Sequence, residues 1–267
     1  MKVVLTIAGS DSSGGAGIQA DLKTIAAHGL YGASAVTALT AQNTLGVRAV
    51  QSAAPDFLAA QLDAVFEDLP PDAVKIGMVS EIALIGVIAD RLKRYRPPVV
   101  VVDPVMVSTS GSRLLAEDAQ AALTELLLPL AAVITPNIPE AEALTGLSIH
   151  SAAEQMEAAA LLAARCRSAV LVKGGHRVND ANDCLFDQGS ARWFNGERID
   201  NPNTHGTGCT LSSAIACNLA LGMMLPAAVR RAKAYLSAAL RNGMDLGRGP
   251  GPLNHVFAVR PFDAPAD

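Results

Sequence analysis

The segment Gly206-Thr207-Gly208-Cys209 is built from small residues of the kind that begin a phosphate-binding helix. It lies within a stretch from Asn201 to Val229 that contains no Asp, Glu, Lys or Arg, and it opens the helix expected there. Small residues at a helix start leave the first backbone N–H groups exposed, and these groups hold a partial positive charge. We therefore predict an anion hole suited to a transferring phosphoryl group. Cys209 falls in the first turn, where the pKa of a thiol tends to fall, although an inert buried cysteine fits the same pattern.

Three further segments place polar side chains directly after apolar stretches: Asp103, Asn137 with Glu140, and Lys173. A carboxylate at the end of a buried strand is costly unless it is paired or bound to a metal. Asn137 and Glu140 could supply two oxygen ligands to Mg²⁺, which usually bridges substrate phosphates; taken alone, Glu140 equally fits the first turn of a helix. Lys173 could reach phosphate oxygens or lie in solvent. Together with the anion hole, these residues predict phosphoryl transfer, in which catalysis is mostly positioning and charge neutralisation.

A glycine-rich loop from Gly9 to Gly17 follows the first apolar run. Such a loop between a strand and a helix lets the backbone approach a ligand closely, and the helix N-terminus favours anions. It is not a Walker A loop, because Gly15-Ala16 stands where Lys-Ser/Thr is required. The run Gly15–Ala20 matches G-x-G-x-x-A, but no acidic residue follows at the spacing that binds a ribose, so a nicotinamide enzyme is a weak alternative. We expect the loop to close over a small substrate, with a plain tight turn as the alternative.

Alternating strands and helices must position these residues. Short apolar, β-branched runs predict strands at Val3–Ala8, Ala33–Leu39, Ala73–Ile76, Val99–Val102, Ala132–Thr135 and Ala169–Val172. Longer amphipathic stretches predict helices at Gly17–His28, Asp56–Leu69, Glu81–Arg94, Glu117–Leu127 and Ala152–Cys166. Strands that are apolar throughout indicate a parallel sheet covered on both faces. The alternation predicts an α/β fold, a three-layer α/β/α sandwich with a mostly parallel central sheet.

The last third of the chain departs from this alternation. Cys184–Phe186 and Ala191–Phe194 predict a hairpin, which we expect to form an antiparallel edge of the sheet. Two helices follow, at about Gly208–Leu221 and Pro226–Asn242. In such sheets ligands bind beyond the carboxyl ends of the strands, which is where the loops described above would meet.

The composition excludes several classes of protein. Of 267 residues, 50% are apolar and 17% are charged, so the chain is not disordered, and one domain spanning residues 1–267 is expected. A net charge of −4 and a pI of about 5.7 argue against a general nucleic-acid binder. The four cysteines, at positions 166, 184, 209 and 217, form no CxxC pair and fit a reducing cytoplasm. Polar residues interrupt the uncharged stretch, which predicts a buried core helix rather than a membrane span.

Collinear motifs along nearly the whole chain resemble those of the hydroxymethylpyrimidine/phosphomethylpyrimidine kinases of thiamin biosynthesis, within the ribokinase-like superfamily. Together the motifs are highly specific. They are Thr6–Lys23, Thr37–Thr44, Lys75–Met78, Asp103–Met106, Thr135–Ala141, Lys173–His176, Asn203–Ser213 and Gly251–His255. The resemblance implies a ribokinase-like fold.

The resemblance also implies how a pyrimidine would be bound. Gln42 matches the family residue that hydrogen-bonds the aminopyrimidine ring, and its amide offers a donor and an acceptor together, which suits the alternating nitrogens of such a ring. The residues that would line the pyrimidine pocket are Gly9, Ala16, Asp21, Met78 and Val105.

On the phosphate side, Asn137 and Glu140 match the superfamily's Asn-x-x-Glu metal motif, and Lys173 would contact ATP phosphates. Gly206 to Cys209 match the anion hole. Cys209 stands where many superfamily members have an Asp base, and it is our candidate base for the first step. Asp103 is expected to be a metal ligand or to lie next to one.

The resemblance implies an ATP- and Mg²⁺-dependent kinase that phosphorylates 4-amino-5-hydroxymethyl-2-methylpyrimidine and then converts the monophosphate to the diphosphate. Its partners would be these small molecules, and neither nucleic acid nor a membrane. The resemblance also implies a homodimer located in the cytoplasm. The nearest alternative is a pyridoxal or pyridoxine kinase of the same branch, against which Gln42 argues. The alternative from another class is a binding or regulatory protein without catalysis, against which Lys173, Glu140 and the 206–209 loop argue.

Overall fold

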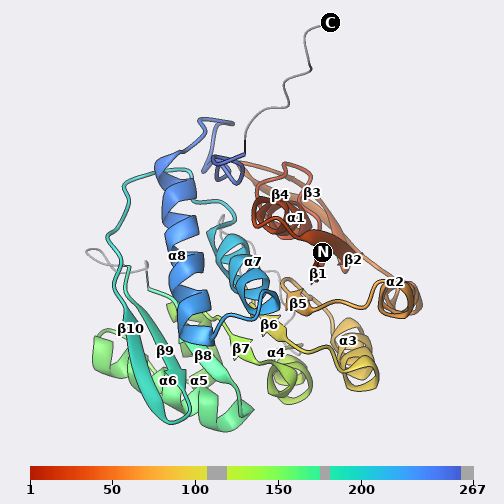
Figure 1. The fold of residues 1–267 in the computed structure, drawn as a ribbon, viewed down its shortest axis with the longest axis horizontal. Coiled ribbons are helices and arrows are strands. Elements are labelled where there is room, and N and C mark those ends of the chain that lie inside the picture. The colour runs from red at the N-terminus through yellow and green to blue at the C-terminus, as the bar shows by residue number, and fades with distance from the viewer. Residues whose placement is uncertain (107–118, 175–180, 260–267) are drawn as a thin grey trace, which may run out of the picture.

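The computed structural model describes residues 1–106, 119–174 and 181–259, which form a central sheet between two layers of helices (Figure 1). The sheet has eight strands in the order β10-β9-β8-β7-β6-β5-β1-β2. The strands from β8 to β2 in that order run parallel, whereas β9 and β10 pair antiparallel and form the predicted edge. The strands are β1 (Val3–Ala8), β2 (Tyr31–Val36), β5 (Ala73–Ile76), β6 (Val100–Val102), β7 (Val133–Ile134), β8 (Ala169–Val172), β9 (Asp183–Asp187) and β10 (Ser190–Phe194).

The two helical layers arise because neighbouring strand residues point to opposite faces of the sheet. Val4 and Val101 pack in one core, and the adjacent Leu5 and Val102 pack in the other. The first core lies beneath α1 (Gly17–Ala27), α7 (Thr207–Ala220) and α8 (Leu225–Arg241). The second lies beneath α2 (Pro55–Asp68), α3 (Ile82–Tyr95), α5 (Ile138–Thr145) and α6 (Ala152–Cys166). The predicted three-layer α/β/α sandwich is confirmed.

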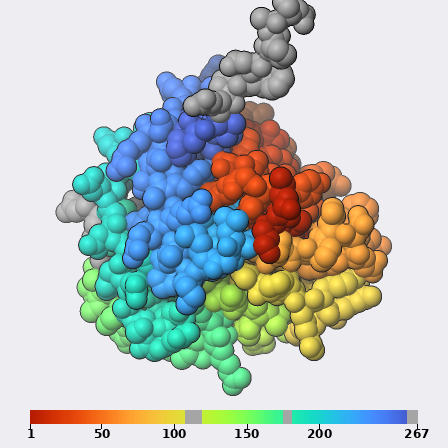
Figure 2. Space-filling model, viewed as in Figure 1, coloured from red at the N-terminus to blue at the C-terminus, as the bar shows by residue number. Residues whose placement is uncertain are grey.

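The uncharged stretch after residue 201 forms α7, a core helix as predicted. Ten of its 14 residues are buried, and it packs against α8, α1 and β5. Figure 2 shows the surface of α7 and α8, in blue, over the middle of this face. Among the described residues, no helix is both long enough and apolar enough to cross a bilayer.

The predicted strand Ala33–Leu39 is wrong in one respect, because the chain leaves the main sheet at Thr37. The Thr37 hydroxyl donates to the Met78 carbonyl (2.7 Å) and its N–H donates to the Ala8 carbonyl (3.0 Å). These bonds turn the chain between β2 and β3 (Ala38–Asn43), which pairs with β4 (Gly46–Ser52) in a separate two-stranded sheet. β4 was not predicted, because its mixed, largely exposed side chains lack the apolar pattern of a buried strand.

Two helical regions also differ from expectation. Residues 117 and 118 of the predicted helix Glu117–Leu127 lie outside the described residues. The remainder is a short α4 (Ala119–Ala122), followed by a π-helical turn (Leu123–Leu127) and a 3₁₀ turn (Leu128–Leu130). Helix α5 was not predicted as an element, because its eight residues are too few to show a helical period.

Candidate active site

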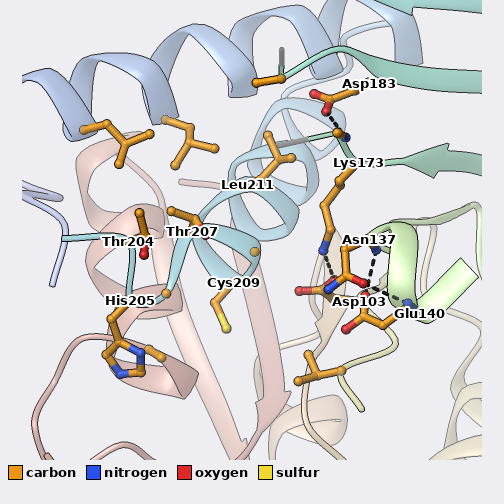
Figure 3. A pocket seen from close by; sticks show the side chains of 18 of the residues that line it. Asp103, Asn137, Glu140, Lys173, Asp183, Thr204, His205, Thr207, Cys209 and Leu211 are labelled. Atoms are coloured by element: carbon orange, nitrogen blue, oxygen red, sulfur yellow. Dashed lines mark hydrogen bonds and ion pairs between the residues drawn. The ribbon is translucent and has the colours of Figure 1, made fainter. Parts of the chain in front are cut away.

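The carboxyl ends of five parallel strands open into one cavity of about 740 Å³. β1, β5, β6 and β8 end immediately before the loops that contain Gly9, Met78, Asp103 and Lys173, and β7 leads into Asn137. Nearly all predicted site residues line this cavity: Gly9, Ala16, Gln42, Met78, Asp103, Val105, Asn137, Glu140, Lys173, Gly206, Thr207, Gly208 and Cys209. Figure 3 shows the phosphate-side residues gathered around it. The predicted residue that does not line the cavity is Asp21.

The start of α7 depends on two glycines. Gly206 caps the helix in the left-handed conformation (φ 85°), where a side chain would be strained. A Cβ on Gly206 would also collide with the carbonyl oxygen of Gly15, so the cap packs directly on the glycine-rich loop. A Cβ on Gly208 would lie 3.3 Å from both Asp103 Oδ2 and Lys173 Nζ. The first turn of α7 therefore faces the cavity with bare backbone, as an anion hole requires.

Asp103 and Lys173 form an ion pair beside this helix start. Lys173 Nζ donates to Asp103 Oδ1 at 2.7 Å, and the Thr135 hydroxyl donates to the same oxygen at 3.1 Å. Ser212 Oγ on α7 lies 3.4 Å from Asp103 Oδ2. Asp103 is 1% exposed, so its charge is acceptable only because it is paired. Burial by itself would lower the pKa of Lys173, but the charges of Asp103 and Glu140 raise it, so Lys173 stays cationic.

Asn137 and Glu140 form the N-terminal capping box of α5. Asn137 Oδ1 accepts from the Glu140 N–H, and Glu140 Oε2 accepts from the Asn137 N–H, each at 2.8 Å. The helix-cap interpretation of Glu140 is thus confirmed, and it is compatible with a site role because both residues also line the cavity. Burial raises the pKa of Glu140 to about 7, more than the nearby Lys173 lowers it.

Asp21 lies beneath the cavity, and the expectation that it lines the pyrimidine pocket is corrected. Both its oxygens accept from Lys75 Nζ, at 2.9 and 2.8 Å. The hydroxyls of Thr6 and Ser213 also donate to it, at 2.6 and 2.7 Å. All of this is fully buried, because the side chain at position 21 of α1 points into the core under α7. The sequence signal for Lys75 was a single lysine in the otherwise apolar strand Ala73–Ile76.

Cys209 lies in the first turn of α7 and faces the cavity, as predicted. Its thiol differs from expectation, because burial raises its pKa to about 11. The charge of Lys75 and the Gly17 amide act in the opposite direction, while Asp21 and Asp103 reinforce the rise. Cys209 is therefore a neutral thiol at pH 7 when no substrate is bound.

The other end of the cavity is formed by the glycine-rich loop and β3. Gln42 lies here, with its backbone clamped by Ser12, whose hydroxyl donates to the Gln42 carbonyl (2.7 Å) and accepts from its N–H (2.8 Å). Sequence reasoning gave no role to Asp11 or to His205, yet His205 Nε2 lies 2.8 Å from Asp11 Oδ2 and 3.2 Å from Gln42 Nε2. Asp11 had no signal beyond its place in the loop, and His205 none beyond preceding Gly206. His176, the last residue of the Lys173–His176 motif, lies outside the described residues.

A third charged pair, also not predicted, lies farther along the cavity. Lys233 on α8 pairs with the buried Asp183, which also accepts from the Gly174 N–H at 2.8 Å. Burial raises the pKa of Asp183, and Lys233 counteracts part of that rise. This pair fixes the chain directly after Lys173.

The arrangement has two chemically different ends. One offers an anion hole, a lysine and two carboxylates, which can hold and neutralise transferring phosphates. The other offers an amide next to small residues and Met78, which suits a flat, partly polar ring. A ring substituent that reaches toward Cys209 would meet the phosphate end.

Comparison with known proteins agrees with this chemistry. A family model described as phosphomethylpyrimidine kinase matches residues 11–254. The chain is 53% identical over 257 residues to the thiamine biosynthesis bifunctional protein ThiED of Geobacter sulfurreducens; the match covers 96% of this chain but only 52% of that protein, so the chain spans about half its length. It is 53% identical over 259 residues to the hydroxymethylpyrimidine/phosphomethylpyrimidine kinase of Rhizobium meliloti, covering 95% of this chain and 96% of that one.

Two solved structures are similar along most of the chain. The crystal structure of phosphomethylpyrimidine kinase from Clostridium difficile has a TM-score of 0.81 at 48% identity, covering 90% of this chain and 99% of that one. An ADP complex of Bacillus subtilis pyridoxal kinase has a TM-score of 0.89 at 38% identity, covering 96% of this chain and 98% of that one.

Proposed function

The chain belongs to the phosphomethylpyrimidine kinase family, and we propose that it transfers the γ-phosphoryl group of ATP to 4-amino-5-hydroxymethyl-2-methylpyrimidine and then to the resulting monophosphate, in thiamin biosynthesis. The observation that supports this most directly is the two-ended cavity. Lys173 and the bare start of α7 lie at one end and the Gln42 amide at the other, within a single space. We take residues 1–267 as one catalytic domain.

In the first step, the substrate hydroxyl oxygen attacks the γ-phosphorus, a new P–O bond forms, and the bond to the oxygen of ADP breaks. The backbone N–H groups at Gly206–Cys209 and the Lys173 ammonium stabilise the charge on the transferring group. The hydroxyl proton has to leave, and Cys209 as thiolate is our candidate to accept it. In the second step the nucleophile is an already ionised phosphate oxygen, so no base is required.

A magnesium ion fits the donor chemistry around Lys173. The described residues contain no cluster of three or more His, Cys, Asp or Glu side chains, so a cage made only of protein ligands is not available there. Mg²⁺ in kinases needs only one or two carboxylates, with water and substrate phosphates completing its shell. Glu140 and Asn137 would hold the ion, with Asp103 beside them. Once bound, it would neutralise phosphate charge.

A pyridoxal kinase is the second candidate, because a solved pyridoxal kinase matches this fold closely. Gln42 favours the pyrimidine, since an amide can pair with a ring nitrogen and an adjacent amino group at once. A binding protein without catalysis is disfavoured, because Lys173, Glu140 and the 206–209 segment all reach the same cavity. On family resemblance we also propose a cytoplasmic homodimer, which sedimentation equilibrium would test.

ATP turnover separates an enzyme from a binding protein. We expect purified protein with Mg²⁺ and ATP to release ADP only when the hydroxymethylpyrimidine is added, and to form the monophosphate before the diphosphate. Lys173→Ala, with Lys93→Ala on the exposed side of α3 as its matched control, should abolish this release. Pyrimidine binding without ADP release would refute the proposed activity.

A further inference from the structure

His205 lies where the ring end and the phosphate end of the cavity meet. It immediately precedes Gly206, the cap of α7, and it is 8% exposed. Figure 3 shows its ring directed toward the N-terminal segment, away from the phosphate-side cluster. There its Nε2 contacts both Asp11 Oδ2 (2.8 Å) and Gln42 Nε2 (3.2 Å). One ring nitrogen therefore contacts both the glycine-rich loop and the residue proposed to bind the substrate ring.

The partners of Asp11 determine where the proton of this nitrogen lies. Asp11 Oδ1 accepts from the N–H (2.8 Å) and hydroxyl (2.7 Å) of Ser13, and Oδ2 accepts from the N–H groups of Gly15 (3.1 Å) and Ala16 (2.8 Å). A carboxylate surrounded by four other donors is ionised and accepts only. His205 Nε2 therefore must donate to it. This holds for the neutral and for the charged imidazole, because the proton on Nε2 is present in both.

The proton on His205 Nε2 determines which atom of the Gln42 amide, the oxygen or the nitrogen, can face it. Its Nε2 lies 3.2 Å from His205 Nε2, which sets two donors against each other. Its Oε1 lies 3.2 Å from Thr40 Oγ1, but the single hydroxyl hydrogen of Thr40 is already donated to the Ser10 carbonyl at 2.8 Å. Rotating the amide by 180° exchanges two groups of nearly equal size and satisfies both contacts. The oxygen then faces the His205 N–H as the second and longer acceptor of the hydrogen that points mainly to Asp11, and the NH₂ group donates to Thr40.

We propose that His205, held by ionised Asp11, is a positioning residue that fixes the orientation of the Gln42 carboxamide and thereby selects the substrate ring. The Gln42 backbone is already clamped by Ser12, so the side-chain torsions, including the amide rotation, are the freedom that remains. With the amide fixed, the acceptor lies on the His205 side and the donor on the Thr40 side. This order matches a heteroaromatic ring that has an amino donor next to a ring-nitrogen acceptor. The inference rests on the proposed role of Gln42 in ring binding.

An analogue with the opposite order tests the proposal. In 5-hydroxymethyl-2-methylpyrimidin-4-one, a carbonyl acceptor and a ring N–H donor replace the amino group and the bare nitrogen. We expect the wild-type protein to prefer the amino compound by about 10²-fold or more in kcat/KM. His205→Leu frees the amide to turn and should reduce this preference to about tenfold or less, without changing the KM for ATP. His205→Gln, which keeps an N–H donor, should retain more of the preference. His150→Leu makes the same replacement at an exposed position and should behave as the wild type.

A spectroscopic measurement on the unmodified protein removes any dependence on how the variants fold. Nitrogen-15 NMR of the histidine side chains, with His205 assigned by comparison with His205→Gln, should show Nε2 protonated at pH 6 to 9. An unprotonated Nε2 would overturn the proposal, as would an unchanged amino-over-oxo preference in folded His205→Leu. If the wild type phosphorylates neither pyrimidine, the proposed function fails, and the NMR result still decides the hydrogen-bond assignment.

Discussion

Removing the ammonium of Lys75 should destabilise the protein far more than removing an exposed lysine. Lys75 is fully buried, and its Nζ lies 2.9 and 2.8 Å from the two oxygens of Asp21, itself fully buried. Lys75→Met would leave that carboxylate with only the hydroxyls of Thr6 and Ser213. Breaking a buried pair from one side costs about 3–5 kcal/mol. Because a domain is stable by only about 5–15 kcal/mol, the loss would be a large part of the total.

The assay is denaturant unfolding at pH 7 followed by circular dichroism, with two comparison variants. Lys2→Met removes an exposed ion pair with Asp72, in which the lysine side chain is 52% exposed, and should cost about 1 kcal/mol or less. Lys75→Met combined with Asp21→Asn removes both charges and should recover part of the stability. If Lys75→Met cost no more than Lys2→Met, the assignment of Lys75 and Asp21 as a tightly paired buried unit would be refuted.

Three further predictions concern catalysis. Cys209→Ala should slow the first phosphorylation by about 10²-fold and leave the second nearly unchanged, and equal losses in both steps would remove Cys209 from the base role. Because burial raises the pKa of Cys209 to about 11, the rate of the wild-type first step should also rise by up to about tenfold per pH unit between pH 7 and 10. Glu140→Gln should raise the Mg²⁺ concentration for half-maximal rate about tenfold in both steps, equivalent to roughly 1.4 kcal/mol, and a Mg²⁺ titration identical to that of the wild type would count against the metal role. Since burial raises the pKa of Glu140 to about 7, the wild type should need more Mg²⁺ as the pH falls below 7. Gly206→Ala places a side chain on a backbone in the left-handed region (φ 85°) and against Gly15, so kcat for both steps should fall by about 10²-fold or more. Unchanged turnover in a folded variant would show that the geometry of this cap does not contribute to catalysis.

Most of the sheet was predictable because its strands are continuous apolar runs buried on both faces. The same rule placed Asp103 and Lys173 at one edge, since parallel strands end together. It failed at Ala33–Leu39, where β2 and β3 belong to different sheets but follow each other directly, and only the hydrogen bonds of Thr37 mark the turn between them. The rule also does not apply to β4, whose side chains are mostly exposed.

Within the site, local spacing was informative and distant contacts were not. Asn137 and Glu140 have the same spacing in a metal motif and in a capping box, so the sequence left both interpretations open, and the structure shows the box directly. The contact of His205 with Asp11 joins positions 194 residues apart, and that with Gln42 joins positions 163 apart. No periodicity or local motif reports such pairs. Asp21 was expected in the pocket from the family resemblance, and its contact with Lys75, 54 positions away, had only the weak signal of one lysine in an apolar strand.

The most direct test of the proposed activity is a competition between two rings. The purified protein is incubated with ATP, Mg²⁺ and equimolar hydroxymethylpyrimidine and pyridoxal, and the products are followed by mass spectrometry over time. We predict the pyrimidine monophosphate first and the diphosphate after it, with little pyridoxal phosphate. Pyridoxal phosphate as the sole product would contradict the substrate assignment while leaving the phosphate machinery in place, and the absence of any phosphorylated product would contradict the kinase activity itself.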